Sequence, residues 1–205
     1  MKQIEALQRL KRLGDNGFET RDAAALLGVT RANAHMILRR LERGGLLTHV
    51  THGRWLSGRE THRFNLPELI SAPSPSYVSL QSALFHHGLI EQIPSVIYAV
   101  TLGRPRRVTT PLGTVSFHRV PPDLFEGFEI TAENAKVATA EKALFDLLYL
   151  SPSRSRLFAR LPEIQLPRRF QWAVLRRYAG RVKSQSRRTL LLASIEQLKS
   201  ATMPE

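Results

Sequence analysis

The chain has 205 residues, contains no cysteine and carries a formal net charge of +13 at pH 7. The absence of cysteine excludes disulfide bonds and thiolate metal sites, and it is compatible with a reducing cytoplasm. No apolar run is long enough to span a bilayer, and the first residues lack the apolar centre of a secretory signal. We therefore expect a cytoplasmic protein with no membrane partner.

The positive charge lies at the two ends of the chain. Residues 1–57 hold ten Lys and Arg against five Asp and Glu, residues 58–150 hold eight against nine, and residues 151–205 hold twelve against three. Two basic ends around a neutral middle favour a polyanionic partner such as nucleic acid. The alternative is that the arginines serve solubility alone.

The first 57 residues are predicted to form three helices followed by a β-hairpin. Thr20 and Thr30 stand where a helix N-cap is expected, Gly28 closes the helix after Thr20, and Gly44-Gly45 ends the helix after Thr30. Helix, turn, helix and hairpin in this order are typical of a winged helix-turn-helix, a DNA-binding domain. The expected helices are residues 2–13, 21–27 and 31–43, and the expected strands are residues 46–50 and 54–56.

The third expected helix is amphipathic. Its apolar face, which should pack on the other helices, holds Ala34, Ile37, Leu38 and Leu41. On the opposite face apolar side chains lie beside arginines, which suits a major groove offering thymine methyl groups, guanine edges and phosphates. A helical hairpin with solvated arginines is the alternative. The predicted DNA-binding residues are Thr30, Arg31, Ala32, Asn33, His35, Met36, Arg39, Arg40 and Arg43 on this helix, and His52 and Arg54 in the hairpin.

Proline and serine at residues 71–76 indicate a boundary, so residues 58–76 are expected to link the first domain, residues 1–57, to a C-terminal domain, residues 77–205. Ser79 is expected to cap a helix there. A small antiparallel sheet, a buried helix and basic C-terminal helices complete an α+β fold. The expected strands are residues 96–102, 106–110, 114–120 and 128–130, and the expected helices include residues 139–150 and 186–201.

The sequence contains no phosphate-binding P-loop, no nucleophile elbow and no zinc-protease helix motif. His86 and His87 are adjacent, and neighbouring helical side chains point about 100° apart, which rarely suits one metal ion. His87 is therefore expected to be a packed core histidine. Glu141 at the start of a helix is explained by the helix dipole. We expect no enzymatic activity, no cofactor and no metal.

Two further groups of arginines form a candidate second basic surface. One lies between expected strands, where it either contacts nucleic acid or another acidic surface, or forms an exposed hairpin tip. The other belongs to the C-terminal helices, where it either extends a DNA footprint or binds RNA. The two groups are Arg104, Arg106 and Arg107, and Arg168, Arg169, Arg176 and Arg177.

Three stretches are distinctive in order and spacing: YVSLQSALFHHGLIEQIP at residues 77–94, VTLGRPRRVTTPLGTVSFHRV at residues 100–120, and TAEKALFDLLYL at residues 139–150. Together with NGFET at residues 16–20, they resemble the AbiEi family of antitoxins and transcriptional regulators of type IV toxin–antitoxin systems. The resemblance covers roughly residues 1–200. Where that family often has Gly-x-Tyr in the hairpin, this chain has Gly-Arg-Trp at residues 53–55.

The resemblance implies a regulator that binds inverted repeats in its own promoter through the N-terminal domain and represses it. The C-terminal domain would counteract a nucleotidyltransferase-like toxin encoded alongside, without forming a stable complex with it. A third interpretation of the C-terminal arginines is that they serve this role directly. Because the sequence has no coiled-coil heptads, we expect a monomer in solution and two copies on DNA.

Two alternatives remain open from the sequence. One is a ligand-sensing one-component regulator, which requires an apolar pocket with convergent polar groups in the second domain. The other is an interaction protein that binds RNA or a toxin through the basic C-terminal tail.

Overall fold

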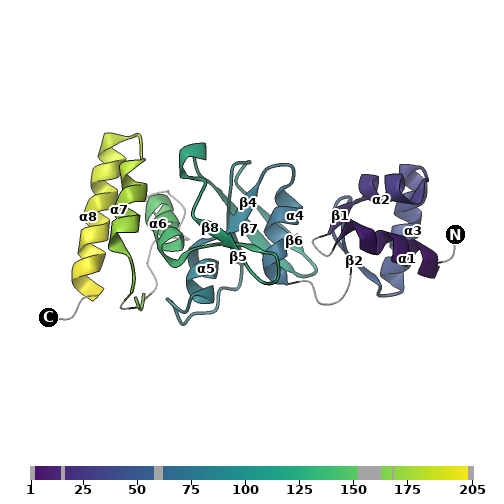
Figure 1. Ribbon diagram of the computed structural model, residues 1–205, viewed down its shortest axis with the longest axis horizontal. Helices are drawn as coiled ribbons and strands as arrows, with labels where there is room; N and C mark the ends of the chain where they lie inside the picture. Colours follow the sequence, from purple (N-terminus) through teal and green to yellow (C-terminus); the bar gives the residue numbers. More distant parts are fainter. Residues whose placement is uncertain (1–2, 15–16, 58–61, 152–162, 168, 203–205) are drawn as a thin grey trace.

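The computed structural model of the chain describes residues 3–14, 17–57, 62–151, 163–167 and 169–202. Its elements form a row, with three helices and a small sheet at the N-terminal end, a larger sheet in the middle and two helices at the C-terminal end (Figure 1). Residues 3–57 are called the head below, and residues 62–202 the second unit. The expectation of an α+β fold is confirmed.

Three helices and a three-stranded antiparallel sheet build the head. The sheet has the order β1-β3-β2, so a short strand before the second helix joins the expected hairpin. Leu10, Leu38 and Trp55 are fully buried between the helices and this sheet. The elements are α1 (Gln3–Leu10), η1 (Lys11–Leu13), β1 (Phe18–Glu19), α2 (Thr20–Leu27), α3 (Arg31–Arg43), β2 (Leu47–Thr51) and β3 (Arg54–Ser57).

Thr20 does not cap α2 as the sequence predicts. Glu19 is the N-cap residue, and its backbone N–H donates to the Asp22 carboxylate over 2.9 Å in a capping box. The Thr20 hydroxyl is buried, accepts from the Trp55 indole N–H over 2.9 Å and donates to the Gly53 carbonyl over 3.2 Å. Thr20 therefore joins α2 to the β2–β3 turn.

The second unit contains a six-stranded mixed sheet in the order β6-β7-β5-β4-β9-β8. The expectation of a small antiparallel sheet is therefore wrong, because the sheet has six strands and contains parallel pairs. β4 and β5 form a central antiparallel pair, and the second strand of each flanking hairpin lies inward, so β7 runs parallel to β5 and β9 parallel to β4. The strands are β4 (Ser76–Val78), β5 (Ile97–Thr101), β6 (Arg106–Thr110), β7 (Gly113–Arg119), β8 (Phe128–Ile130) and β9 (Lys136–Ala138).

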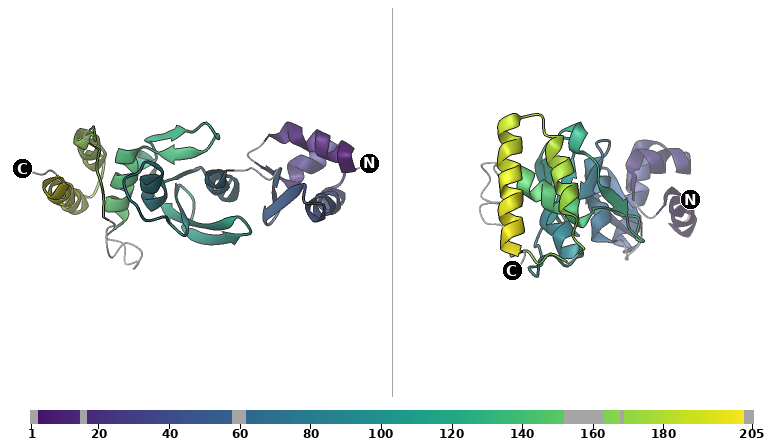
Figure 2. Two further views of the ribbon diagram at one scale, coloured as in Figure 1. Left: turned by 90° about the horizontal axis from the view of Figure 1, so that it is seen from below. Right: turned by 60° about the vertical axis from the view of Figure 1, so that its left-hand side comes forward.

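Helices pack around this sheet, and the last two lengthen the second unit away from the head. α4 contacts β4, β5 and β7, whereas α5 and α6 pack on each other and contact β5 and β9 respectively. α7 packs on α6, and α8 packs on α7 at the end of the molecule far from the head (Figures 1 and 2). The helices are η2 (Arg63–Asn65), α4 (Leu66–Ser71), α5 (Leu80–His86), η3 (Pro122–Leu124), α6 (Ala140–Leu150), α7 (Trp172–Gly180) and α8 (Gln185–Thr202).

Most of the expected linker, residues 58–76, is not a linker. η2 and α4 occupy residues 63–71, Leu66 and Ile70 are buried in the core of the second unit, and Ser76 begins the central strand β4. Pro67 occupies the first turn of α4, where its missing N–H costs no helical hydrogen bond. Residues 58–61 lie outside the described residues.

Two expectations for the start of the second unit are wrong. The Ser79 hydroxyl makes no cap hydrogen bond to α5, because it donates to the buried Asp146 carboxylate over 2.7 Å. α5 ends at His86, so His87 falls beyond the apolar face, is exposed, and holds the Ala138 carbonyl through its Nε2 over 2.7 Å.

A buried ion pair lies at the centre of the second unit. Lys142 and Asp146, one turn apart on α6, are both fully buried, with 2.5 Å between Nζ and Oδ1. The hydroxyls of Tyr77 and Ser79 donate to Oδ2 over 3.0 and 2.7 Å. Burial raises the pKa of the Asp146 carboxyl, and the Lys142 ammonium and the two hydroxyls oppose that rise. Four polar groups therefore satisfy one another inside an apolar core.

The ammonium of Lys142 also sits among aromatic rings. Its Nζ lies 4.8 Å from the ring centroid of Phe145 and 5.2 Å from that of Tyr178. Gly127, with φ at +75°, leaves the space for this arrangement, since an added Cβ would overlap the Tyr178 hydroxyl. The pair is therefore enclosed by packing as well as by hydrogen bonds.

The head and the second unit meet at a tight seam. Gly17, with φ at +88°, sits where an added Cβ would lie 2.7 Å from the Trp55 carbonyl oxygen and 2.8 Å from a methyl carbon of Leu69 on α4. Val50 and Leu56 of the head belong to the same apolar cluster as the core of the second unit. These contacts set where the head stands on the second unit.

Candidate nucleic-acid interface

The outer face of α3 is exposed as the sequence predicts. Of the expected inward residues, Ala34, Leu38 and Leu41 are buried and Ile37 is partly buried. The Thr30 hydroxyl caps the helix by accepting the Asn33 N–H over 3.3 Å. All the predicted contact residues of α3 are exposed: Thr30, Arg31, Ala32, Asn33, His35, Met36, Arg39, Arg40 and Arg43.

Met36 is the clearest anomaly on this face, because 64% of it is exposed. A large apolar side chain in water beside arginines contributes nothing to the head core. Ala32 precedes it by one turn on the same face. The two residues give α3 a narrow apolar strip inside a basic surface.

The N-terminal end of α3 lies beside the turn of the β2–β3 hairpin. A Cβ added to Gly53 would be 3.9 Å from a guanidinium nitrogen of Arg31. His52, at the tip of the same turn, is exposed. A surface that meets the start of α3 can therefore also meet the hairpin turn.

The arginines of α3 differ in how far they are engaged. Arg39 pairs with Glu42 over 2.6 Å on the exposed surface, and such pairs contribute about 0–1 kcal/mol. Within the described part of the chain, Arg40 and Arg43 form no ion pair. Arg43 is thus ready to meet a phosphate, whereas Arg39 has to exchange one carboxylate partner for another anion.

His49, which the sequence did not single out, completes this region together with the predicted contact residue His35. His49 on β2 packs on Trp55, with 4.5 Å between ring centroids, and His35 of α3 lies edge-on to Trp55 at 5.9 Å. Burial lowers the pKa of His49, Arg39, His35 and His52 lower it further, and Glu42 opposes them. The charged groups that shift this pKa come from both α3 and the hairpin, so His49 lies in the electrostatic field of both elements. The only sequence signal for His49 was its place in an expected strand.

Arg54 was predicted to contact DNA, but in the structure its side chain lies between the head and α4. Only 15% of its side chain is exposed. Its guanidinium donates to the carbonyl oxygens of Leu69 and Ala72 at the C-terminal end of α4, and lies 3.3 Å from the Glu19 carboxylate. The carbonyls at a helix end have no partner within the helix, and Arg54 satisfies them. Arg54 therefore joins the head to the second unit and does not belong to the exposed surface.

The candidate second basic surface is two separate groups. Arg104, Arg106 and Arg107 are exposed at β6, although Arg106 also donates to the Ile70 carbonyl over 2.9 Å. Arg169, Arg176 and Arg177 belong to the other end of the second unit, at and just before α7 (Figure 1). Arg176 pairs with Glu196 of α8 over 2.6 Å, and Arg177 lies by the Tyr178 ring. Arg168 lies outside the described residues.

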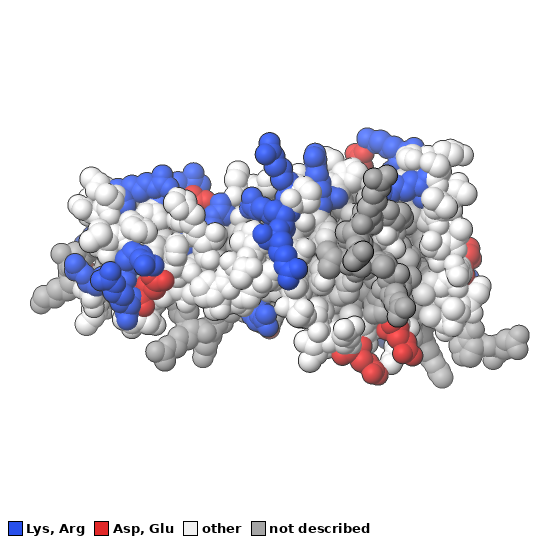
Figure 3. Space-filling model, turned by 180° about the vertical axis from the view of Figure 1, so that it is seen from behind, with Lys and Arg blue, Asp and Glu red and all other residues white. Residues whose placement is uncertain are grey.

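The face opposite to the view of Figure 1 carries many of the basic side chains. Figure 3 shows Lys and Arg in groups over the head and over the middle of the molecule, with acidic side chains confined to smaller groups. A polyanion lying along this face would meet positive charge on both units.

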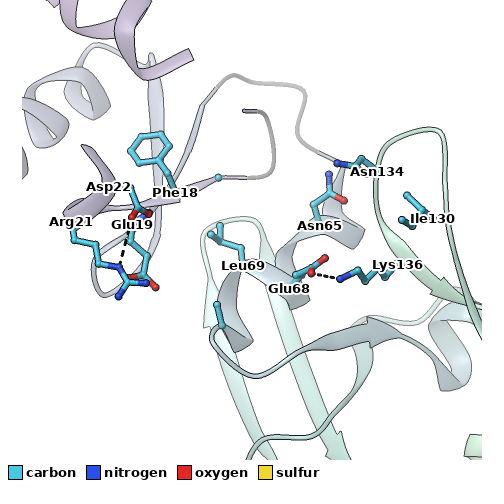
Figure 4. Close-up of a pocket in the computed structure, with 12 residues that line it drawn as sticks. Phe18, Glu19, Arg21, Asp22, Asn65, Glu68, Leu69, Ile130, Asn134 and Lys136 are labelled. Carbon is cyan, nitrogen blue, oxygen red and sulfur yellow. Dashed lines mark hydrogen bonds and ion pairs between the residues drawn. The ribbon is translucent and has the colours of Figure 1, made fainter. Parts of the chain in front are cut away.

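A cavity of about 490 Å³ lies at the seam between the two units, under β1 and beside α4 and β9 (Figure 4). Its charged side chains are paired: Arg21 lies 2.9 Å from Glu19, and Lys136 binds Glu68. The Asn65 Oδ1 atom is buried and has no partner among the described residues. Paired charges of both signs give this cavity no preference for a polyanion, so it is not the interface.

Among the described residues, no group of three or more His, Asp or Glu side chains is placed to hold a metal ion. In that same part of the chain, no helix is both long and apolar enough to cross a membrane. No protein-family model matches the sequence, and a search of curated proteins finds no match.

Proposed function

We propose that the chain is a DNA-binding transcriptional regulator whose head is a winged helix-turn-helix, with α3 in the major groove. The observation that carries the proposal is the outer face of α3, where Ala32 and an exposed Met36 lie among arginines beside the hairpin turn. The major groove admits an α-helix and offers thymine methyl groups to apolar side chains. The hairpin turn with His52 acts as the wing.

The residues of α3 divide by their place along the helix. Arg31, Asn33 and His35 stand near the N-terminal end, which enters the groove first, and they contact bases. Arg39, Arg40 and Arg43 stand in the C-terminal half of the helix and neutralise phosphates. The arginines of β6 extend the phosphate contacts onto the second unit.

One head reads one half-site, so a palindromic operator recruits two copies of the chain. We propose that the operator is a pair of inverted repeats in the chain's own promoter, that bound copies repress it, and that the free protein is a monomer. The resemblance to the AbiEi family supports this part of the proposal.

The same resemblance supports a second role, in which the second unit counteracts a nucleotidyltransferase-like toxin encoded alongside. The test is co-expression of that toxin with the chain in growing cells. If the chain gives no protection from the toxin at levels that repress the promoter, this role is wrong and the DNA-binding role still stands.

The experiment that tests DNA binding is a titration of duplex DNA at several salt concentrations. Replacing Arg39 and Arg43 together by alanine should weaken binding to all sequences. The slope of log affinity against log salt should fall by about 0.9 for each lost phosphate contact. Of the two single substitutions, Arg39→Ala should reduce the affinity less than Arg43→Ala, because Arg39 already pairs with Glu42 in the free protein.

The matched control is Arg9→Ala together with Arg12→Ala, which removes the same charge from exposed positions outside α3. If both double variants reduce the affinity and the slope equally, the effect is one of net charge, and α3 is not the contact.

A further inference from the structure

A second cavity, of about 610 Å³, lies on the flank of the second unit. Its walls come from η2, from α5 and from the segment that leads into β5. Its volume falls within the range of about 300–1,000 Å³ that is usual for small-molecule sites. The cavity is distinct from the face of α3 and from the seam below the head.

The walls of this cavity are apolar and open to water. Phe64, Phe85, Ile93 and Val96 line it. Phe85 is 37% exposed and Ile93 is 74% exposed, so both present apolar surface to water. Aromatic and branched aliphatic side chains around one cavity favour a compact apolar ligand.

The polar side chains that line the cavity, among the described residues, are all basic or neutral. They are His62, Arg63, His86 and Ser82, and none of these described lining residues is a carboxylate. The Ser82 hydroxyl is already engaged, since it accepts the Tyr98 N–H over 2.9 Å. The Glu133 carboxylate interacts with both imidazoles but does not line the cavity. Arg63 is therefore the lining residue with a permanent charge in the described part of this site.

The imidazoles are held in place by the aromatic wall. The Phe64 ring lies edge-on to His62 at 5.1 Å and to His86 at 5.7 Å between centroids. Nδ1 of His62 accepts the Phe64 backbone N–H over 3.4 Å, so in the neutral ring the proton is on Nε2. Burial lowers the pKa of His86, with His87 and His62 lowering it further and Glu133 opposing them.

We propose that this cavity binds a small aromatic carboxylate, with its ring against Phe64, Phe85 and Ile93 and its carboxylate at Arg63 and His62. A guanidinium matches a carboxylate with two parallel hydrogen bonds, and such charge-assisted bonds are the strong ones. The imidazole N–H of His62 gives a further donor. A neutral aromatic molecule would fill the same walls and leave these donors without an acceptor.

The test uses anilinonaphthalene sulfonate, a fluorescent aromatic anion, and two competitors of similar size, benzoate and neutral benzyl alcohol. Benzoate should displace the probe from the full-length protein at a concentration at least about tenfold lower than benzyl alcohol, since a hydrogen bond to a charged group contributes about 1.5–3 kcal/mol. Equal displacement by the two competitors, or displacement by neither, overturns the proposal.

Three variants locate the binding. Arg63→Met should abolish the preference for benzoate and keep the displacement by benzyl alcohol, whereas Phe85→Glu should abolish displacement by both. Arg119→Met removes an exposed arginine that lies outside the cavity and outside the proposed DNA interface, and it should leave both displacements unchanged. The circular dichroism spectrum of each variant shows that it is folded. If a folded Arg63→Met or Phe85→Glu variant behaves as the unmodified protein, the compounds bind elsewhere and the proposal is wrong.

Discussion

Replacing Lys142 by methionine is expected to lower the free energy of unfolding of the second unit by about 3–5 kcal/mol. The substitution leaves the Asp146 carboxylate fully buried and without a counter-charge. The Ser79 and Tyr77 hydroxyls still donate to it, but they do not compensate a full charge in an apolar core. Urea denaturation followed by circular dichroism measures the loss.

Two comparisons make this expectation specific. Lys136→Met removes the same side chain from a partly exposed pair with Glu68, and it should cost no more than about 1 kcal/mol. Lys142→Met combined with Asp146→Asn should be more stable than Lys142→Met alone, because the amide still accepts from the hydroxyls without a charge. If Lys142→Met lowers the free energy of unfolding no more than Lys136→Met does, the buried pair does not stabilise the second unit.

Replacing Ala32 by glutamate is expected to weaken duplex DNA binding by at least about 100-fold, because placing like charges together costs several kcal/mol. The new carboxylate would stand on the outer face of α3, where the groove and its phosphates are proposed to lie. Ala32 is exposed and glutamate is a good helix former, so the fold of the head should be unaffected. Fluorescence anisotropy of a labelled duplex measures the affinity.

Ala193→Glu is the matched control for this change. Ala193 is exposed on α8, at the end of the molecule far from the head, and the substitution changes the net charge equally (Figure 1). It should reduce the affinity only slightly. Similar losses from Ala32→Glu and Ala193→Glu would show that α3 does not approach the DNA.

The helices and hairpins whose pattern is local could be predicted from the sequence. The bounds of α3 and of β6 are those expected. The signals that set them are the Thr30 cap and the apolar periodicity for α3, and the turn after β6, and each signal involves residues close together in the sequence. The strands β1, β4 and β9 have two or three residues each, too few for a pattern, and their pairing depends on distant parts of the chain.

The exposed face of α3 could be predicted because its pattern is local. The features that could not be predicted depend on contacts between residues far apart in the sequence. The exposed side of α3 follows from helical geometry alone. The contact of Arg54 with α4 spans 15 residues or more, and no local pattern distinguishes it from a hairpin arginine facing solvent. The spacing of Lys142 and Asp146 is visible in the sequence, but their complete burial depends on Tyr77, Tyr178 and Gly127 from other elements.

Cleavage of DNA by a reagent attached to α3 itself shows whether this helix lies in the major groove. Because the chain has no cysteine, Met36→Cys provides one unique site for an iron chelate that cleaves nearby DNA. The duplex is one selected by the protein from a random library, and Ala193→Cys with the same reagent is the control.

We expect cleavage at discrete positions inside the protected region from Met36→Cys, and none above background from Ala193→Cys. Equal cleavage from both positions, or no cleavage from Met36→Cys while the labelled protein still binds the duplex, would show that α3 does not lie in the groove.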